Sequence, residues 1–173
     1  MTEIERNELS KNAYGGTELM AMALAEKLDD DLKDKFQIIC SRVRDIDEDK
    51  IPILWLHDLP NDPESHHLAD KESRDRFAKF VFVSNWQMNE YIHTYNLDWD
   101  DCAVIKNAIE PIEFDKKPDD GIIRLIYHST PHRGLELLIP VFEFLAERHD
   151  NIELDVYSSF NLYGWPERDK PYE

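Results

Sequence analysis

Arg133 and Gly134 are the residues of this chain whose types and position best suit the binding of a phosphate group. They follow the apolar run at residues 122–127 and precede an amphipathic sequence that begins at Leu135. A helix N-terminus offers unpaired N–H groups and partial positive charge, and a neighbouring guanidinium adds a bidentate donor. We therefore expect a phosphate site at this turn. The alternative is an ordinary strand-to-helix turn whose arginine faces solvent.

Two further positions have residue types that suit binding or catalysis. Gly15 and Gly16 precede a predicted helix, where glycines let the backbone approach a ligand closely. His57 ends the predicted strand at 51–57, and ligands of open α/β sheets gather at the carboxyl ends of the strands. This histidine could transfer a proton or hydrogen-bond a sugar hydroxyl. The alternative is a partly buried imidazole that is bonded to the backbone.

Common metal, nucleotide and nucleophile motifs are absent from the sequence. It contains no GxGxxG, GxxxxGK[ST], GxSxG, HExxH or CxxC pattern, so we expect no metal site and no bound cofactor. Cys40 and Cys102 are expected to be reduced core residues rather than a bridge. Trp86, Tyr91 and Tyr95 recur at roughly helical spacing and are expected to lie in the core rather than to stack on a base.

Composition and charge exclude several classes of partner. The chain has 173 residues, of which 42% are hydrophobic, and a formal net charge of −17. This charge opposes binding to nucleic acid and to anionic lipid, both of which need clustered Lys and Arg. No apolar run reaches the length of about 18 residues that a membrane span needs, and the polar N-terminus does not resemble a secretion signal. We expect a cytoplasmic protein.

Alternating apolar and helical segments predict an α/β fold built on parallel sheets. Strands are predicted at 36–41, 51–57, 79–84, 103–105, 122–128 and 152–157. Helices are predicted at 19–28, 63–77, 86–95 and 134–149. Asn85 is expected to cap the third helix, and Pro140 predicts that the fourth is kinked or begins late.

The segment at 108–121 is the only part of the sequence with the composition of a linker, because it combines two prolines, a glycine and a run of charges. It predicts an N-terminal domain at 1–110, a linker at 111–121 and the first part of a second domain at 122–173. One strand, one helix and one further strand cannot cover both faces of a sheet. The second domain is therefore either cut short, or its strands join the first sheet.

Five short motifs, in this order, resemble the retaining, nucleotide-sugar-dependent glycosyltransferases of family 4. They are residues 12–19 (NAYGGTEL), 56–58 (LHD), 80–87 (FVFVSNWQ), 104–109 (VIKNAI) and 129–135 (STPHRGL). The resemblance covers about residues 12–164 and implies the GT-B fold, which has two Rossmann-like domains that face a cleft. It also implies a nucleotide sugar as donor substrate and a metal-independent reaction.

The resemblance assigns roles by position. Gly15 and Gly16 match the glycine loop near the donor diphosphate and the acceptor, and His57 matches a histidine beside the transferred sugar. Asn107 matches the asparagine of the interdomain motif VIPNGID, which reads VIKNAIE here. Arg133 matches the basic residue that binds the donor diphosphate.

The same donor-binding segment includes Gly134, His128 and Ser129, and it departs from the family pattern. Many members carry arginine at the position of His128, so one fixed charge is missing, which His132 or Arg124 would have to supply.

Two other departures concern the ends of the chain. It begins at the glycine loop, where the family usually places a strand first, and the Glu-x7-Glu region would lie beyond residue 173. We therefore expect a shortened enzyme, weak or inactive as this chain alone, acting on an unidentified acceptor. The alternatives are a non-catalytic GT-B-derived assembly module, which would pair with a second copy or another chain, and a GT-B-like nucleotide-sugar epimerase.

Overall fold

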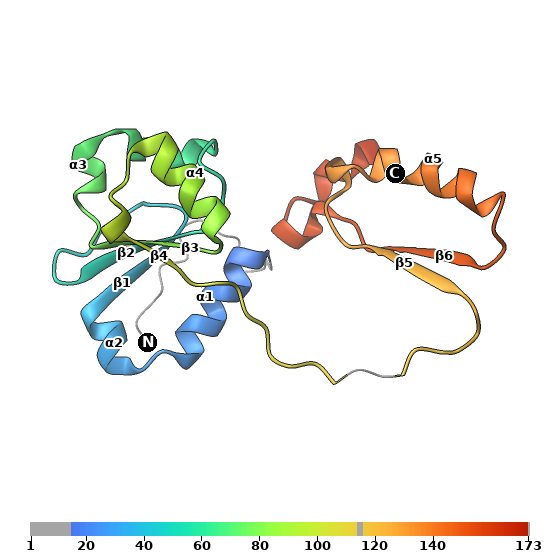
Figure 1. Ribbon diagram of the computed structural model, residues 1–173, viewed down its shortest axis with the longest axis horizontal. Helices are drawn as coiled ribbons and strands as arrows, with labels where there is room; N and C mark the ends of the chain where they lie inside the picture. The colour runs from blue at the N-terminus through green and yellow to red at the C-terminus, as the bar shows by residue number, and fades with distance from the viewer. Residues whose placement is uncertain (1–14, 114–115, 173) are drawn as a thin grey trace. The chain divides into compact units, whose positions relative to one another are not determined.

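The computed structural model describes residues 15–113 and 116–172, which form two compact units at 15–109 and 110–172 (Figure 1). Residues 12–14, where the first family-like motif begins, lie outside the described part. Both units are α/β structures with parallel strands, as the alternating pattern predicts. Among the described helices, none is both long and apolar enough to cross a lipid bilayer.

The first unit contains a four-stranded sheet in which every strand is parallel to its neighbours. Its strands are β1 (Phe36–Cys40), β2 (Ile51–Leu56), β3 (Lys79–Phe82) and β4 (Cys102–Val104), in the spatial order β1-β2-β3-β4. The register pairs Cys40 with Trp55 and Leu56 with Phe82, so the carboxyl ends of the first three strands meet at one edge. Because the order follows the sequence, these four strands contain no reversal at which a ligand crevice would open.

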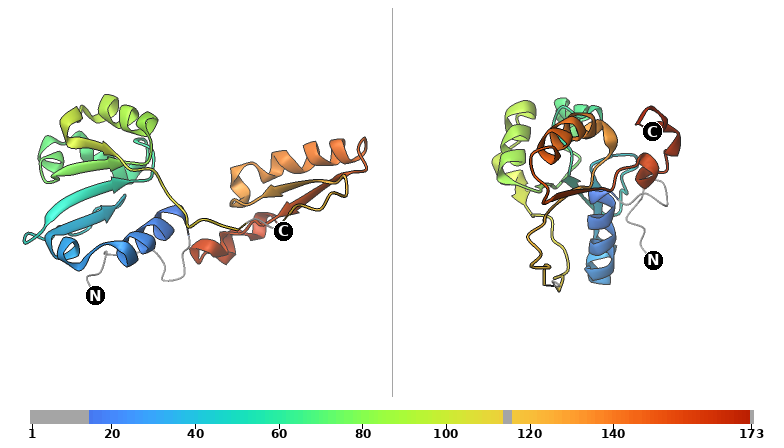
Figure 2. Two further views of the ribbon diagram at one scale, coloured as in Figure 1. Left: turned by 60° about the horizontal axis from the view of Figure 1, so that its bottom comes forward. Right: turned by 90° about the vertical axis from the view of Figure 1, so that its right-hand side faces the viewer.

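Helices cover both faces of this sheet, and those that connect its strands lie on one face, as right-handed crossovers between successive strands require (Figure 1). The segments before β1, α1 (Gly16–Lys27) and α2 (Asp30–Lys35), lie on one face, and the segments that connect β2 to β4 lie on the other (Figures 1 and 2). The latter are the 3-10 helix η1 (Pro63–Ala69) and the helices α3 (Lys71–Arg74) and α4 (Asn85–Tyr95).

The core of the first unit lies between the sheet and the η1–α4 layer. Phe82, Leu54 and Leu56 of the strands are completely buried, as are Leu68 of η1 and Tyr91 of α4. The rings of Phe82 and Tyr91 lie 5.2 Å apart. Burial of side chains of this size is the main contribution to the stability of such a domain.

The observed helix caps show that two of the predicted helix boundaries were wrong. The helix expected at 63–77 is interrupted at Asp70, because the Asp62 carboxylate caps η1 and the Asp70 carboxylate caps α3. The N-cap of α4 is Ser84 rather than Asn85, since the Ser84 hydroxyl accepts the N–H of Gln87 at 3.1 Å. Asp and Ser compete effectively for backbone N–H groups at helix ends.

The second unit has a separate sheet of two parallel strands, β5 (Ile123–Tyr127) and β6 (Ile152–Val156). Its strands therefore do not join the first sheet. The connection is the 3-10 turn η3 (Pro131–Arg133) followed by α5 (Leu135–Ala146). Pro140 lies inside α5, so the helix does not begin late. Three further 3-10 turns follow β6: η4 (Phe160–Tyr163), η5 (Pro166–Arg168) and η6 (Lys170–Tyr172).

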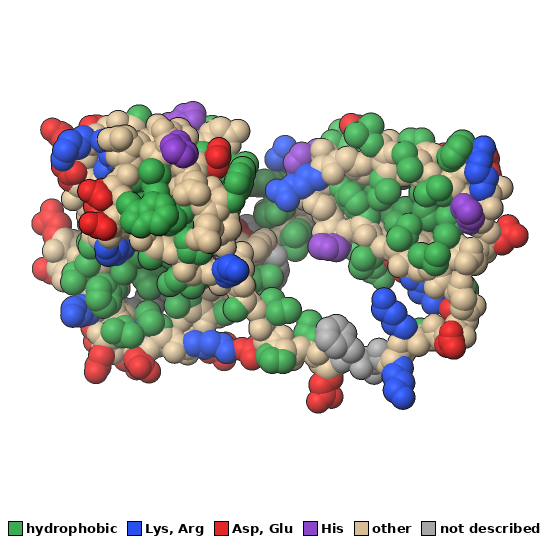
Figure 3. All heavy atoms as spheres, in the orientation of Figure 1, with side chains coloured by type: hydrophobic (Ala, Val, Ile, Leu, Met, Phe, Trp, Pro, Cys, Tyr) green, Lys and Arg blue, Asp and Glu red, His purple; other side chains and the backbone are tan. Residues whose placement is uncertain are grey.

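Most apolar side chains of the second unit remain exposed. Among its described residues only Thr130, Pro131 and Phe160 are buried, and neither β5 nor α5 buries any side chain completely. Ile126 of β5 is 62% exposed and Leu137 of α5 is 70% exposed. Figure 3 shows apolar side chains gathered over this unit. The second unit therefore has regular strands and a helix, but its described residues do not form a hydrophobic core.

Candidate functional site

Three polar residues follow the carboxyl ends of the first three strands of the sheet. Ser41 follows β1, His57 follows β2, and Ser84 lies two residues beyond β3. His57 donates its backbone N–H to the Ser41 hydroxyl at 3.0 Å, so the first two are in direct contact. His57 thus lies at a strand end as predicted, and its backbone is hydrogen-bonded to Ser41.

His57 is half-buried, and both nitrogens of its imidazole are shielded from solvent. Neither of its ring nitrogens makes a hydrogen bond with any residue that the structure describes. Its ring centroid lies 4.6 Å from that of Trp55, at an angle of 51°. The backbone of Trp55 nevertheless interacts favourably with the ring, so the expected alternative, an imidazole bonded to the backbone, stays open. Buried polar atoms usually have partners, so an unpaired imidazole at a strand end is a candidate for ligand binding.

Burial lowers the pKa of His57, because the charged imidazolium loses more hydration than the neutral ring does. The backbone of Trp55 and the negative charge of Asp58 oppose this shift and are the smaller influences. His57 is therefore neutral at pH 7. A neutral imidazole has one nitrogen that donates and one that accepts, which suits a hydroxyl group of a ligand.

Ser41 is a contributor that the sequence did not reveal. It is buried and has a φ of +59°, in the left-handed region that residues other than Gly, Asn and Asp seldom adopt. Its N–H donates to the Trp55 carbonyl at 2.9 Å, and its hydroxyl accepts the His57 N–H. This strained turn fixes the backbone of His57. In the sequence, only the place of Ser41 at the end of a predicted strand indicated that it lies at this edge of the sheet.

Gln87 is a second positioning residue that sequence reasoning missed. Its side chain is almost completely buried and bridges α4 to the loop after β2. The amide nitrogen donates to the carbonyls of Leu56 and Asp58, at 3.2 and 2.7 Å, and the amide oxygen accepts the N–H of Val83 at 2.9 Å. These bonds hold the backbone on both sides of His57. The residue is the last of the motif at 80–87, but its type alone did not indicate this role.

The glycine pair opens α1, as predicted. Gly15 is the N-cap, and no side chain caps the helix there. A Cβ atom placed on Gly16 would meet nothing within 4 Å, and Gly16 is not among the residues of positive φ. Neither packing nor backbone geometry within the described residues requires glycine at position 16. Its proposed role in close approach of a ligand therefore stays a prediction.

In the second unit, Arg133 ends η3 and Gly134 forms the N-cap of α5. The φ of Gly134 is +98°, so the backbone itself requires a glycine there. Arg133 is exposed, and its guanidinium has no hydrogen bond or ion pair with the described residues. No side chain caps the amides at the start of α5. Positive charge and free amides thus lie together at this turn, as the sequence predicts.

The residues expected to replace the missing fixed charge are already engaged. The Arg124 guanidinium pairs with Asp120 at 2.6 Å and with Glu153 at 3.0 Å. The His132 ring stacks on Phe160, with 5.1 Å between centroids and an interplanar angle of 13°. Neither supplies a free charge beside Arg133.

The remaining predicted site residues have ordinary surroundings. His128 is exposed, and the Ser129 carbonyl accepts a hydrogen bond from the Ser158 hydroxyl at 2.7 Å. Asn107 is exposed in the irregular segment after β4. The structure thus assembles one polar group around His57 in the first unit and another around Arg133 in the second.

The cysteines and histidines do not form a metal centre in the described part of the chain. No group of three or more His, Cys, Asp or Glu side chains there could hold a metal ion. Cys40 and Cys102 are free thiols on β1 and β4, the two outer strands of the sheet. With neighbouring strands about 4.8 Å apart, three strand spacings separate them, which is too far for a disulfide.

Comparison with known proteins found no relatives: no protein-family model matches the chain, and no curated protein matches its sequence.

Proposed function

We propose that this protein is a retaining glycosyltransferase, or part of one, that takes a sugar from a nucleotide sugar. The observation that carries the proposal is the half-buried His57 at the carboxyl edge of a parallel sheet, whose ring is neutral and whose nitrogens make no hydrogen bond with a described side chain. Ligands of open α/β sheets bind outside the carboxyl ends of the strands, although the four described strands contain no reversal of order. The order of the five family-like motifs supports the same activity, and they include the segments at 56–58 and 129–135.

In this proposal His57 binds a hydroxyl group of the transferred sugar. A neutral imidazole can accept a hydrogen bond from one sugar hydroxyl and donate to another. Ser41 and Gln87 act as positioning residues, because they fix the backbone on either side of His57. A side chain held in this way loses little conformational freedom when the sugar binds.

Arg133 and the first amides of α5 would bind the diphosphate of the donor. A guanidinium forms bidentate hydrogen bonds to phosphate, and uncapped helix amides add partial positive charge. Both interactions strengthen as negative charge develops on the leaving diphosphate, which is the electrostatic role that a metal ion has in other transferases. Local donors are needed because the net charge of −17 repels an anionic donor.

Gly16, Asn107, His128 and Ser129 enter the proposal by resemblance alone. Their contacts within the described residues neither require nor oppose a role in donor binding.

A non-catalytic assembly module is the second candidate. It is favoured by the exposure of apolar side chains on the strands and the helix of the second unit. Among the large hydrophobic residues described there, only Phe160 is buried. Exposed apolar surface of this extent commonly marks an interaction site. An assembly module would bind no nucleotide, so the experiment below separates the two candidates.

Binding of UDP, GDP and ADP, measured by titration calorimetry, tests the proposed function. We expect one of them to bind, and Arg133→Ala to weaken that binding by about 1.5–3 kcal/mol because a charge-assisted phosphate contact is lost. Arg148→Ala is the matched control, since Arg148 lies just beyond the opposite end of α5 with its guanidinium 3.5 Å from the Phe144 ring centroid. No binding by the parent protein, or equal losses in the two variants, would refute the proposal.

A further inference from the structure

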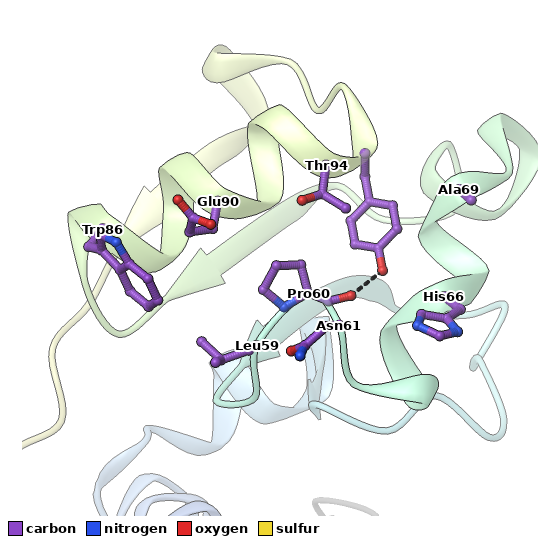
Figure 4. A pocket seen from close by; sticks show the side chains of 9 residues that line it. Leu59, Pro60, Asn61, His66, Ala69, Trp86, Glu90 and Thr94 are labelled. Carbon is purple, nitrogen blue, oxygen red and sulfur yellow. Dashed lines mark hydrogen bonds between the residues drawn. The ribbon is translucent and has the colours of Figure 1, made fainter.

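A groove of about 550 Å³ lies in the first unit, between α4 and the segment that runs from the end of β2 through η1. Trp86, Glu90 and Thr94 of α4 line one side, and Leu59, Pro60 and Asn61 line the other (Figure 4). Glu90 supplies the one carboxylate among the residues that line this groove, and none of them is lysine or arginine. The groove shares none of its lining residues with the proposed transferase site, although Gln87 holds the loop that carries both His57 and Leu59.

Trp86 is the first unusual feature of this groove. Its side chain is 60% exposed, although the sequence suggested a core position. Tyr91 and Tyr95 of the same helix are buried, and of these two only Tyr95 also lines the groove. Glu90 stands one helical turn after Trp86, and residues at this spacing project to the same side. An indole face and a carboxylate therefore line the same wall.

Glu90 is the second feature. Its carboxylate makes no hydrogen bond and no ion pair with any residue of the described part of the chain. Asp62, nearby, is already engaged as the cap of η1, where it accepts the N–H of Glu64. Burial raises the pKa of Tyr95, and the negative charge of Asp62 raises it further. Asp62 therefore acts electrostatically on a residue that lines the groove. The lining of the groove therefore carries one carboxylate and one imidazole, that of His66, and no lysine or arginine.

Hydrogen bonds within the protein preform the groove. The Tyr95 hydroxyl donates to the Pro60 carbonyl across its floor (Figure 4). The Gln87 amide donates to the Asp58 carbonyl and thereby holds the start of the loop that carries Leu59. The walls need no rearrangement to accept a ligand, which reduces the free-energy cost of binding.

We propose that this groove binds an arginine side chain of a basic partner peptide. A guanidinium is flat and weakly hydrated, so it can stack on the Trp86 indole while it donates hydrogen bonds to the Glu90 carboxylate. The net charge of −17 attracts a basic partner and speeds its association. An anionic ligand does not fit, because the lining offers a carboxylate and no lysine or arginine.

The probe for this site is an acetylated and amidated nonapeptide that carries three arginines between glycine and serine residues. A second peptide replaces each arginine with citrulline, which keeps the shape and removes the charge. Binding is measured by titration calorimetry at two salt concentrations. We expect the arginine peptide to bind, more weakly at high salt, and the citrulline peptide to bind at least tenfold more weakly.

Matched variants separate the groove from the general negative charge of the protein. Trp86→Ala and Glu90→Gln are each expected to weaken peptide binding by about three- to tenfold. Trp99→Ala changes a tryptophan that is equally exposed, at 61%, but lies outside the groove, and Glu72→Gln removes an exposed carboxylate of α3. These controls are expected to stay within twofold of the parent.

Two results would overturn the proposal. Equal losses in Glu90→Gln and Glu72→Gln would mean that the peptide responds only to net charge. Binding of a neutral oligosaccharide that is lost in Trp86→Ala, without binding of the arginine peptide, would assign the groove to sugars instead. All four substituted side chains are exposed or line the groove, and unchanged thermal melting of each variant verifies that it is folded.

Discussion

The two units of this protein share a local pattern but differ in what that pattern buries. Both place a helix between parallel apolar strands. In the first unit β3 lies between two neighbours, and three of its four residues are buried, whereas four of the five residues of β5 are exposed. The apolar strand sequence is therefore not sufficient for burial.

The number of strands explains this difference. An inner strand of a parallel sheet is enclosed by neighbours on both sides and by helices on its faces, but a two-stranded sheet has no inner strand. Phe82 is completely buried in the first unit, and Ile126 of the second is 62% exposed. Most of the stability of residues 15–172 should therefore reside in the first unit, and three predictions follow from this comparison.

The largest effect is expected from removing a core aromatic ring. Phe82→Ala should lower the free energy of unfolding of the first unit by about 3–5 kcal/mol, because it leaves a cavity against Tyr91. Phe144→Ala in α5 should change stability by less than about 1 kcal/mol, since that side chain is 55% exposed. Urea unfolding followed by tryptophan fluorescence measures both. Similar losses in the two variants would show that the second unit is packed more tightly than its burial indicates.

A second effect is expected from the buried amide that holds the loop of His57. Gln87→Leu should destabilise the first unit by about 2–4 kcal/mol, because it removes the amide bonds to the Leu56 carbonyl and the Val83 N–H and leaves the Asp58 carbonyl with the Tyr91 hydroxyl alone.

Asn151→Leu is the counterpart in the second unit. There an exposed amide donates to the Gly121 carbonyl at 2.9 Å, and water can replace it, so a loss below about 1 kcal/mol is expected. Urea midpoints give both values. A loss at Gln87 as small as that at Asn151 would contradict its positioning role.

The smallest effect is a dependence of stability on alkaline pH that arises in the first unit. Burial, followed by the charge of Glu18, raises the pKa of the Cys40 thiol to about 12. In the unfolded chain a thiol ionises near pH 8.5, so the contribution of Cys40 is complete below that pH and is lost as pH rises toward 12. The slope should be at most about 1.4 kcal/mol per pH unit. Cys40→Ala should flatten the profile of unfolding free energy between pH 8.5 and 10.5, and an unchanged slope would exclude this cause.

Sequence patterns predicted the strands well and the helix ends less well. The strands at 79–84 and 36–41 were recognisable because their apolar runs have the length and composition of buried strands. The helix expected at 63–77 was wrong because hydrophobic periodicity does not register the capping by Asp62 and Asp70. The cap of α4 was misplaced by one residue for a similar reason, since Ser84 and Asn85 are both good capping residues.

Trp86 shows why burial on a helix needs more than approximate spacing. Each helical residue turns by about 100°, so Trp86 lies about 140° around α4 from Tyr91 and on the opposite side from Tyr95. The prediction of a shared core position was therefore wrong for Trp86 and right for the two tyrosines. For the candidate site, a strand-end position was enough to select His57, but not to find Ser41 or Gln87. Both act through backbone contacts that join segments distant in the sequence.

The sequence by itself determined the alternation of strands and helices, the linker after the first unit and the turn that carries Arg133, because each depends on local periodicity and backbone preference. Only the tertiary structure decided that the ring nitrogens of His57 are shielded from solvent, that Arg124 is paired with acids, and that Trp86 faces a groove. These properties depend on which side chains from distant segments come within hydrogen-bonding or packing distance. Such contacts are set by the fold as a whole.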